Sequence, residues 1–348
     1  MPLVTTPIAT GRLGFLLPPM PPLPGATGSG GTPGTTTGHT FGSTNWVTSL
    51  ASAAETAGAA GVWATDHLFW TRPSPECLTT LAVAAAVTGE ATVGACVLQL
   101  PLRAPAVVAK QAAALQVLSG GRFVLGVGVG SHEGEYDLAG VPFHTRGKAL
   151  DTGIEAMRAA WRTAGEPGHY RLEPCGTVPV WVGGASDAAI GRAAAVGDGW
   201  VPLFLDPEEF AAALVRLREA AAAAGRGPDA VVPAVVMVAS VGDDPQAARA
   251  SGTAWLSALY GIPAKAFDRH LVAGSAEHCA DVAQDYVAAG AAHVIVLVAA
   301  DDALGSFRPM AAAYNRLATR ATRRQPASGP DGAARRWART DDMAGVGA

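Results

Sequence analysis

Short apolar segments alternate with longer alanine-rich segments along nearly the whole of this chain. The short segments have the length and β-branched content of buried strands, and the longer ones repeat apolar residues with the period of a helix. Alternation of this kind predicts an α/β fold built on a parallel sheet. The expected strands are Leu13–Leu17, Gly61–Ala64, Thr92–Leu98, Phe123–Val127, Val180–Val182, Gly199–Val201, Val231–Ala239 and His293–Val298.

Eight strands, each followed by a helix, favour a closed (β/α)8 barrel, the TIM barrel, over an open doubly wound sheet. The active site of such a barrel lies at the carboxyl ends of its strands. Three irregular stretches interrupt the alternation, and we expect them to form insertion loops on or near that face. They are Pro18–Gly42, Val129–Phe143 and roughly Gly252–Gly274.

The barrel is expected to span residues 11–321, after a short N-terminal extension over residues 1–10. From Thr322 onward the sequence is rich in arginine, glycine and proline and has no hydrophobic period. This composition predicts a disordered tail over residues 322–348.

Composition excludes several classes of protein. Hydrophobic residues make up 49% of the 348 residues, so the chain is not disordered as a whole. Lysine and arginine number 25 against 29 aspartates and glutamates, a net charge of −4. Because nucleic-acid binding needs a broad positive field, we expect no nucleic-acid partner.

Cellular location is inferred from what the sequence lacks. No basic and then apolar leader opens the chain, and the longest apolar run, Val231–Ala239, contains Pro233 and is too short to span a bilayer. The four cysteines lie far apart, without a C-x-x-C pair that would indicate a disulfide framework or a zinc site. These features predict a cytoplasmic protein with no membrane partner.

Asp66 and His67 directly follow the expected strand Gly61–Ala64, at the mouth of the barrel. A neighbouring carboxylate could fix the tautomer of His67 or raise its pKa, which would make the imidazole a proton donor near neutral pH. The same pair could also be structural or solvated. A metal site is not expected, because further ligands at suitable spacing are absent.

Glycines lie at the ends of two other expected strands. Gly126, Gly128 and Gly130 resemble a dinucleotide fingerprint, but Ser131 stands where its third glycine is required, and the polar segment that follows is expected to be a loop. Gly183 and Gly184 precede an expected helix that begins near Ser186. Since a helix N-terminus attracts anions, this turn is a candidate phosphate site.

Taken together, these segments resemble the bacterial luciferase-like monooxygenase family, which includes a branch that uses the deazaflavin coenzyme F420. The resemblance is collinear over about residues 11–320, and the order and spacing of its segments make it specific. The segments are Ala54-Glu55 with Gly58, Trp63–His67, Pro75–Leu81, Leu100–Arg103 with Pro105, Leu118–Phe123, Gly126–Gly130, Arg146-Gly147, Val180–Gly184 and Gly197–Trp200.

The resemblance implies a reduced flavin or deazaflavin lying across the strand ends, with His67 at its reactive edge or at the substrate. It also implies a non-prolyl cis peptide in the third strand, between Cys96 and Val97, that forms a bulge behind the ring. The cofactor phosphate would be held by the backbone of Val129 and Gly130. It would also be held by a second segment, comprising Gly183, Gly184, Ala185 and Ser186, with the Ser186 hydroxyl contributing.

Two departures from the family bear on the cofactor. Ser131 stands where the sugar-phosphate dehydrogenases of the deazaflavin branch carry a catalytic glutamate, so that activity is not expected. Val129 stands where bacterial luciferase has an arginine that grips its phosphate, which weakens the expectation of FMN. We therefore expect coenzyme F420 and hydride transfer, with Asp66 and His67 as catalytic residues.

Two other activities stay open at this stage. The first is an FMN-dependent two-component monooxygenase, which would need dioxygen and a separate reductase. The second, of another class, is a barrel that binds a ligand without turnover. The low charge near the expected lids favours a largely apolar small-molecule substrate. The resemblance implies a homodimer, with a separate flavin or F420 reductase as a further partner.

Overall fold

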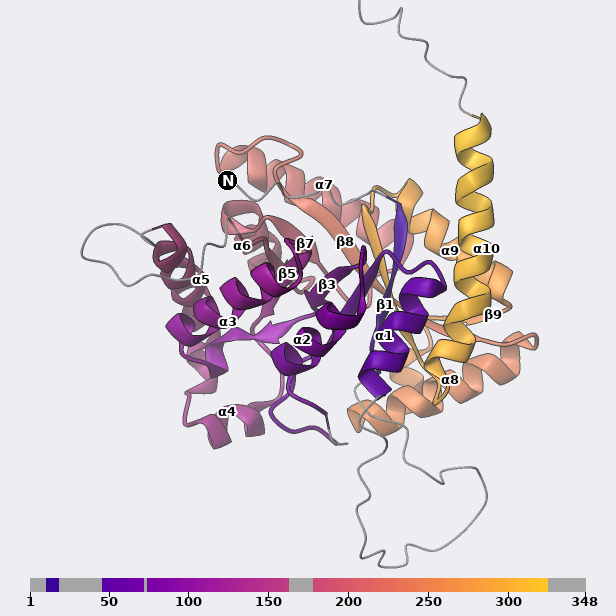
Figure 1. Ribbon diagram of the computed structural model, residues 1–348, viewed down its shortest axis with the longest axis horizontal. Coiled ribbons are helices and arrows are strands. Elements are labelled where there is room, and N and C mark those ends of the chain that lie inside the picture. The colour runs from indigo at the N-terminus through magenta and orange to yellow at the C-terminus, as the bar shows by residue number, and fades with distance from the viewer. Residues whose placement is uncertain (1–10, 19–45, 72–73, 163–177, 325–348) are drawn as a thin grey trace, which may run out of the picture.

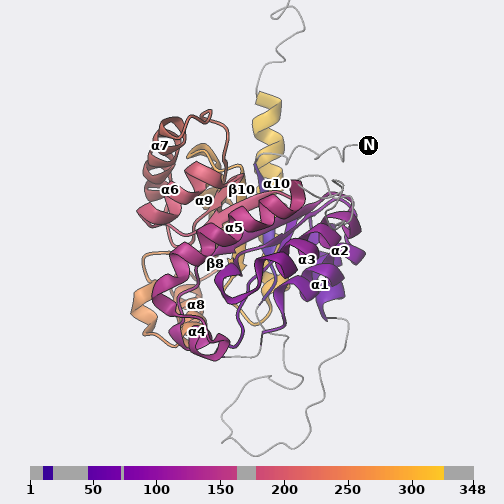
Figure 2. The same ribbon diagram turned by 90° about the vertical axis from the view of Figure 1, so that its left-hand side faces the viewer.

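The computed structural model describes residues 11–18, 46–71, 74–162 and 178–324. Their parallel strands form a closed barrel surrounded by helices (Figures 1 and 2), which confirms the expected (β/α)8 architecture. The barrel closes because β10 pairs with both β1 and β8. Around the barrel the strands are β1 (Arg12–Leu16), β2 (Gly61–Ala64), β3 (Thr92–Ala95), β5 (Phe123–Gly128), β6 (Val180–Gly183), β7 (Gly199–Val201), β8 (Val232–Val241) and β10 (His293–Val298).

Helices cover the outside of the barrel, and several have clear starting signals. Helix α7 begins with a capping box between Asp206 and Glu209, and Ser275 caps the first turn of α9. The helices are α1 (Trp46–Thr56), α2 (Cys77–Val87), α3 (Pro105–Leu118), α4 (Glu133–Ala139), α5 (Arg146–Arg162), α6 (Asp187–Val196), α7 (Pro207–Ala223), α8 (Pro245–Tyr260), α9 (Ala276–Ala288) and α10 (Ala303–Arg324).

Two strands differ from expectation. The segment expected as one strand, Thr92–Leu98, is two, since β3 ends at Ala95 and the short β4 (Leu98–Gln99) pairs further along β5. An additional strand, β9 (Leu271–Gly274), pairs with the carboxyl end of β8. Four residues with one glycine at the end carry too little pattern to be recognised as a strand in the sequence.

Two of the three expected loops are also largely regular. Val129–Phe143 contains α4, whose C-cap Gly140 takes the left-handed conformation. Gly252–Gly274 begins inside α8 and ends in β9. Most of the third, Pro18–Gly42, lies outside the described residues, as do the expected extension 1–10 and most of the expected tail, although α10 continues to Arg324.

Two large aromatic side chains fill part of the barrel interior. Trp63 of β2 and Trp181 of β6 are fully buried, with ring centroids 5.2 Å apart. Neighbouring strands make room with glycine: a Cβ on Gly94 would lie 2.2 Å from the Trp63 ring, and one on Gly199 would lie 2.4 Å from the Trp181 ring. Large and small residues therefore alternate across the interior, as close packing requires.

Charged residues of two of the family-like segments connect helices to strands. The Glu55 carboxylate at the end of α1 accepts hydrogen bonds from the backbone amides of Gly89, Glu90 and Ala91. Arg122 donates to backbone carbonyls around the end of α2, including that of Thr88 at 2.8 Å. These residues stabilise the scaffold, away from the strand ends where the site is expected.

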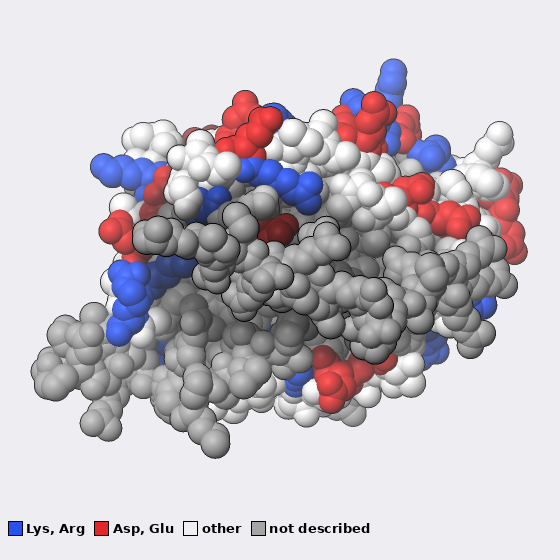
Figure 3. Space-filling model, turned by 90° about the horizontal axis from the view of Figure 1, so that it is seen from above, with Lys and Arg blue, Asp and Glu red and all other residues white. Residues whose placement is uncertain are grey.

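Acidic and basic side chains lie interspersed among the described residues of the face shown in Figure 3. A broad basic surface is not seen on that part of the molecule. None of the helices of the described chain has both the length and the hydropathy to cross a membrane.

Candidate active site

Asp66 and His67 lie at the carboxyl end of β2, but their side chains have different partners. The Asp66 carboxylate, 3% exposed, accepts two hydrogen bonds from the Arg103 guanidinium, at 2.7 and 2.8 Å, and one from the Gln99 amide at 2.8 Å. Burial raises the pKa of Asp66, and the contacts with Arg103 and the Gln99 amide oppose that rise. The Asp66 carboxylate is therefore paired with Arg103. The sequence led us to expect that Asp66 fixes the tautomer of His67, and these contacts do not include His67.

The carboxylate beside His67 belongs to Glu135, a residue of α4 that the sequence reasoning missed. Glu135 Oε2 lies 3.1 Å from His67 Nδ1, and Oε1 accepts a hydrogen bond from the Leu68 amide at 2.6 Å. Glu135 has no exposed surface. The sequence pattern placed Glu135 in a polar loop, where an acidic side chain is normally solvated. The contact between Glu135 and His67 becomes apparent only once α4 is known to form.

Aromatic rings link His67 to a small cavity in the mouth of the barrel. Trp70 stacks on His67 with a centroid distance of 3.9 Å, and its ring meets Tyr260 edge-on at 5.8 Å. Tyr260 lines a cavity of about 170 Å³ together with residues on the barrel strands or just after their carboxyl ends. The other lining residues are Leu16, Thr65, Cys96, Val97, Gly183, Gly184, Val201, Leu203, Val236 and Leu297.

The bulge between β3 and β4 forms one wall of this cavity. The Cys96–Val97 peptide is cis, as the resemblance implied. The Val97 side chain fills the space that side chains on β5 and β6 would need, because a Cβ on Gly128 would lie 2.6 Å from it and one on Gly183 would lie 2.9 Å from it. Burial raises the pKa of Cys96 to about 12, so the thiol in this wall stays protonated.

Two peptide groups of the expected phosphate site are each held by an aromatic donor. The Tyr136 hydroxyl donates to the carbonyl of Val129, and the Trp200 indole donates to the carbonyl of Gly184 at 2.8 Å. In a trans peptide the N–H points opposite to the C=O. The amides of Gly130 and Ala185 are therefore directed away from these aromatic side chains.

Ser186 caps α6, and a serine hydroxyl that accepts a capping hydrogen bond keeps its own hydrogen to donate. Its Oγ accepts from the Ala189 amide at 3.3 Å. The amides of Asp187 and Ala188, at the first two helical positions, have no partner within the helix and are open to an anion. The Asp187 carboxylate is 90% exposed and pairs with Arg216.

The structure brings most of the expected cofactor residues together. Cys96, Val97, Gly183 and Gly184 line one cavity, whereas Val129, Gly130, Ala185 and Ser186 contribute backbone or a cap at the ends of β5 and β6. His132 and Glu133, in the polar segment that follows the glycine-rich strand, are exposed. Among the described residues no group of three or more His, Cys, Asp or Glu side chains is arranged to hold a metal ion.

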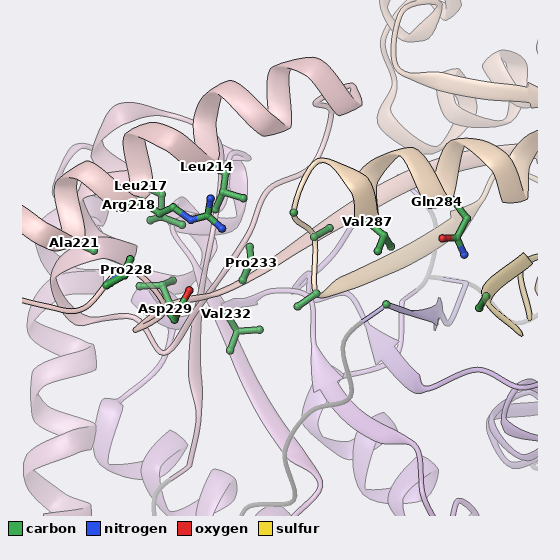
Figure 4. Close-up of a pocket in the computed structure, with 16 residues that line it drawn as sticks. Leu214, Leu217, Arg218, Ala221, Pro228, Asp229, Val232, Pro233, Gln284 and Val287 are labelled. Atoms are coloured by element: carbon green, nitrogen blue, oxygen red, sulfur yellow. The ribbon is translucent and has the colours of Figure 1, made fainter. Parts of the chain in front are cut away.

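A second, larger pocket of about 800 Å³ lies at the opposite end of the strands (Figure 4). Leu214, Leu217 and Arg218 of α7 form one side of it, and Val287 and Gln284 of α9 contribute another. It includes residues at the amino ends of β1, β8 and β10, so it is separated from His67 by the length of the barrel. Although this pocket is the larger of the two, its position at the amino ends of the strands excludes it as the candidate active site.

The closed barrel, the strand-three bulge and the facing glycine turns define a (β/α)8 protein whose candidate site lies at the carboxyl ends of the strands. The family model described as luciferase-like monooxygenase matches residues 26–260, which is more than half of the chain. The chain belongs to this family.

Individual relatives agree with this assignment. An uncharacterized protein of Mycobacterium tuberculosis is 37% identical over 167 residues, covering 44% of this chain and 57% of the relative. A phthiodiolone/phenolphthiodiolone dimycocerosates ketoreductase of the same species is 33% identical over 195 residues, covering 51% of each chain. The chain thus spans about half the length of the curated relatives it matches.

Among solved structures, an F420-dependent secondary alcohol dehydrogenase in complex with an F420–acetone adduct has a similar fold. It superposes with a TM-score of 0.66 at 19% sequence identity, over 77% of this chain and 94% of that one. At this level of identity the likeness supports the barrel fold.

Proposed function

We propose that this protein is an oxidoreductase that uses coenzyme F420 to transfer hydride to or from a small organic substrate. The observation that carries the proposal is the placement of His67, with a buried carboxylate at one ring nitrogen, at the strand ends that also hold an apolar cavity walled by the Cys96–Val97 bulge. Trp70 and Tyr260 connect the His67 ring to that cavity. The ketoreductase relative and the structural likeness to an F420-dependent secondary alcohol dehydrogenase support this reaction class.

The residues present fit such a cofactor. The 170 Å³ cavity is smaller than the roughly 300–1,000 Å³ of ligand pockets, so it would enclose only part of the ring system. The phosphorylated arm would lie along the ends of β5 and β6, toward the amides of Gly130 and Ala185. Those amides and the start of α6 offer N–H donors and a positive helix end to a phosphate.

When bound, the deazaflavin would supply a two-electron hydride acceptor or donor. In alcohol oxidation the carbinol C–H bond breaks with its electron pair, the C=O bond forms, and the hydroxyl proton must be removed. His67 takes that proton, and in ketone reduction it returns a proton to the carbonyl oxygen. The apolar wall of Leu16, Val97 and Leu297 excludes water from the reacting groups.

Binding and turnover can be measured separately to test the proposal. Coenzyme F420 and FMN are added in turn to the purified protein, and binding is followed by fluorescence quenching and thermal shift. Turnover is then measured without oxygen, using small secondary alcohols with oxidised F420 and the matching ketones with reduced F420. We expect F420 to bind and hydride to be exchanged with at least one alcohol–ketone pair.

The same measurements separate the two competing functions. Tight binding of FMN instead of F420, with a substrate that is oxygenated only when dioxygen and a reductase are present, would identify a two-component monooxygenase. Binding of neither cofactor would leave a ligand-binding barrel without redox activity. Either result contradicts the proposal.

A further inference from the structure

We propose that Glu135 is a positioning residue that keeps a hydrogen on His67 Nδ1, so that Nε2 is the nitrogen that exchanges a proton with the substrate. This inference rests on the proposed function for its catalytic meaning. The tautomer that it assigns is a property of the protein alone.

The Glu135 carboxylate receives donors from three directions. Its Oε1 accepts from the amides of Leu68 and Phe69, at 2.6 and 3.4 Å, and its Oε2 faces Gln99 Nε2 and His67 Nδ1, each at 3.1 Å. The side chain is completely buried. A buried carboxylate is stable only when its oxygens are satisfied by donors, and these contacts satisfy both oxygens.

The orientation of the Gln99 amide is fixed by its surroundings. Gln99 Nε2 lies 3.0 Å from the carbonyl oxygen of Asp66 and 3.1 Å from Glu135 Oε2. Reversing the amide would set its oxygen against these two acceptors. Nitrogen is therefore the atom at this position, and its two hydrogens are donated to Asp66 and Glu135.

Because both hydrogens of Gln99 are used, Gln99 cannot donate to His67, although Nε2 lies 3.4 Å from Nδ1. The remaining partner of Nδ1 is Glu135 Oε2, which is an acceptor. Nδ1 must then carry a hydrogen. In the neutral imidazole this leaves a lone pair on Nε2, and in the imidazolium the Glu135 carboxylate stabilises the positive charge.

The orientation of the His67 ring determines which of its nitrogens can reach the substrate. The imidazole edge that bears Nδ1 faces Glu135, so Nε2 is on the other side of the ring, and the stacked Trp70 restricts rotation. As a general base, Nε2 accepts the substrate hydroxyl proton, and as a general acid it returns that proton. Glu135, at a distance of 68 residues in sequence, supplies the orientation that Asp66 was expected to supply.

The experiment compares wild type with the isosteric variant Glu135→Gln, using protein labelled with nitrogen-15 in histidine and free of cofactor. Imidazole nitrogens are observed by NMR across the pH range in which the protein is folded, and the His67 signals are assigned by their loss in His67→Gln. The matched control is Glu133→Gln, which removes an exposed carboxylate from the same helix.

In wild type and in Glu133→Gln we expect a hydrogen on His67 Nδ1 in both the neutral and the charged ring. In Glu135→Gln the new amide keeps its oxygen toward the Leu68 and Phe69 amides, and its nitrogen replaces Oε2. Gln99 Nε2 then loses its acceptor on residue 135, and both amide nitrogens face Nδ1 as donors. Nδ1 must then accept, so the neutral ring switches to the tautomer with hydrogen on Nε2. A neutral wild-type ring with hydrogen on Nε2, or a tautomer unchanged in Glu135→Gln, would overturn the proposal.

Kinetics then test the catalytic meaning. With the substrate found for the wild type, Glu135→Gln should lower kcat by about 100-fold or more, which is the usual scale of general acid–base catalysis, while cofactor affinity is unchanged. The pH dependence of kcat/KM should shift, whereas Glu133→Gln should match wild type. If no hydride transfer is found in any variant, the proposed function fails, but the NMR result still decides the role of Glu135.

Discussion

Arg103 donates to both carboxylate oxygens of Asp66, and this pair connects the end of β2 to the segment before α3. Asp66 is almost completely buried, and Arg103 is 15% exposed. Beyond Arg103, the Asp66 carboxylate has the Gln99 amide, so its charge is compensated locally. The pair holds the backbone from which His67 projects.

Replacing Arg103 with methionine should therefore destabilise the protein strongly, because it leaves a buried carboxylate without its counter-charge. The expected loss is about 3–5 kcal/mol of unfolding free energy. Urea unfolding of Arg103→Met measures it. Arg216→Met, which breaks the exposed pair with Asp187, is the control and should cost less than about 1 kcal/mol. Equal losses in the two variants would contradict the structural role assigned to Arg103.

The hydrogen bond from Trp200 to Gly184 predicts a specific effect on cofactor binding. Trp200→Phe keeps an aromatic ring but leaves the Gly184 carbonyl without its donor, so the peptide that aims the Ala185 amide is no longer fixed. The Kd for F420 should rise about tenfold. Trp161→Phe is the matched control, since Trp161 makes the same type of bond to the Ala109 carbonyl between α5 and α3. If both variants bind F420 equally well, the turn does not depend on Trp200.

Glycine at position 183 is predicted to be required by the bulge. In Gly183→Ala the new methyl group would lie 2.9 and 3.0 Å from the two γ-carbons of Val97, which would displace the cavity wall. F420 binding, followed by fluorescence quenching, should be lost or greatly weakened. Gly191→Ala on α6, where a Cβ meets nothing within 4 Å, should bind normally and gain up to about 1 kcal/mol in stability. If Gly183→Ala binds F420 normally, the deazaflavin ring does not lie against the wall formed by Val97.

His293 predicts an acid-sensitive fold. Burial in the barrel, where the ring packs against Trp181, lowers the pKa of His293 from its usual value of 6.5 to about 4. As pH falls through this window, the unfolded state binds a proton that the folded state refuses, so stability decreases. The loss approaches about 3 kcal/mol by pH 4.

Urea unfolding of wild type and His293→Phe between these pH values measures this contribution as the difference between the two stability curves. His144→Phe, a change at an exposed histidine, is the control and should follow the wild-type pH dependence. If His293→Phe loses stability with acid as steeply as wild type, His293 is not the responsible group.

Local pattern in the sequence located most of the strands and favoured a closed barrel, whose closure the strand pairing confirms. The segment Gly61–Ala64, for example, is bounded and buried as its apolar run indicates. The resemblance supplied the Cys96–Val97 bulge, which no periodicity would reveal. The short strand β9 and the seven-residue helix α4 were missed, because each has too few residues to establish a period.

Partner choice between side chains could not be predicted. Asp66 is adjacent to His67 in the chain, but the strand end directs it toward Arg103, 37 residues away. Glu135 reaches His67 only because α4 folds over the end of β2. Contacts of this kind depend on where separate elements meet in space, which the local pattern of a sequence does not show.

The most direct test of the account is anaerobic hydride transfer with coenzyme F420. Reduced F420 is mixed with the protein and a panel of small apolar ketones, and its reoxidation is followed by the return of deazaflavin absorbance and by the alcohol formed. The account predicts one alcohol produced per F420 oxidised, without dioxygen, and a rate reduced about 100-fold or more in His67→Ala. Absence of transfer by the wild type, or an undiminished rate in His67→Ala, would contradict it.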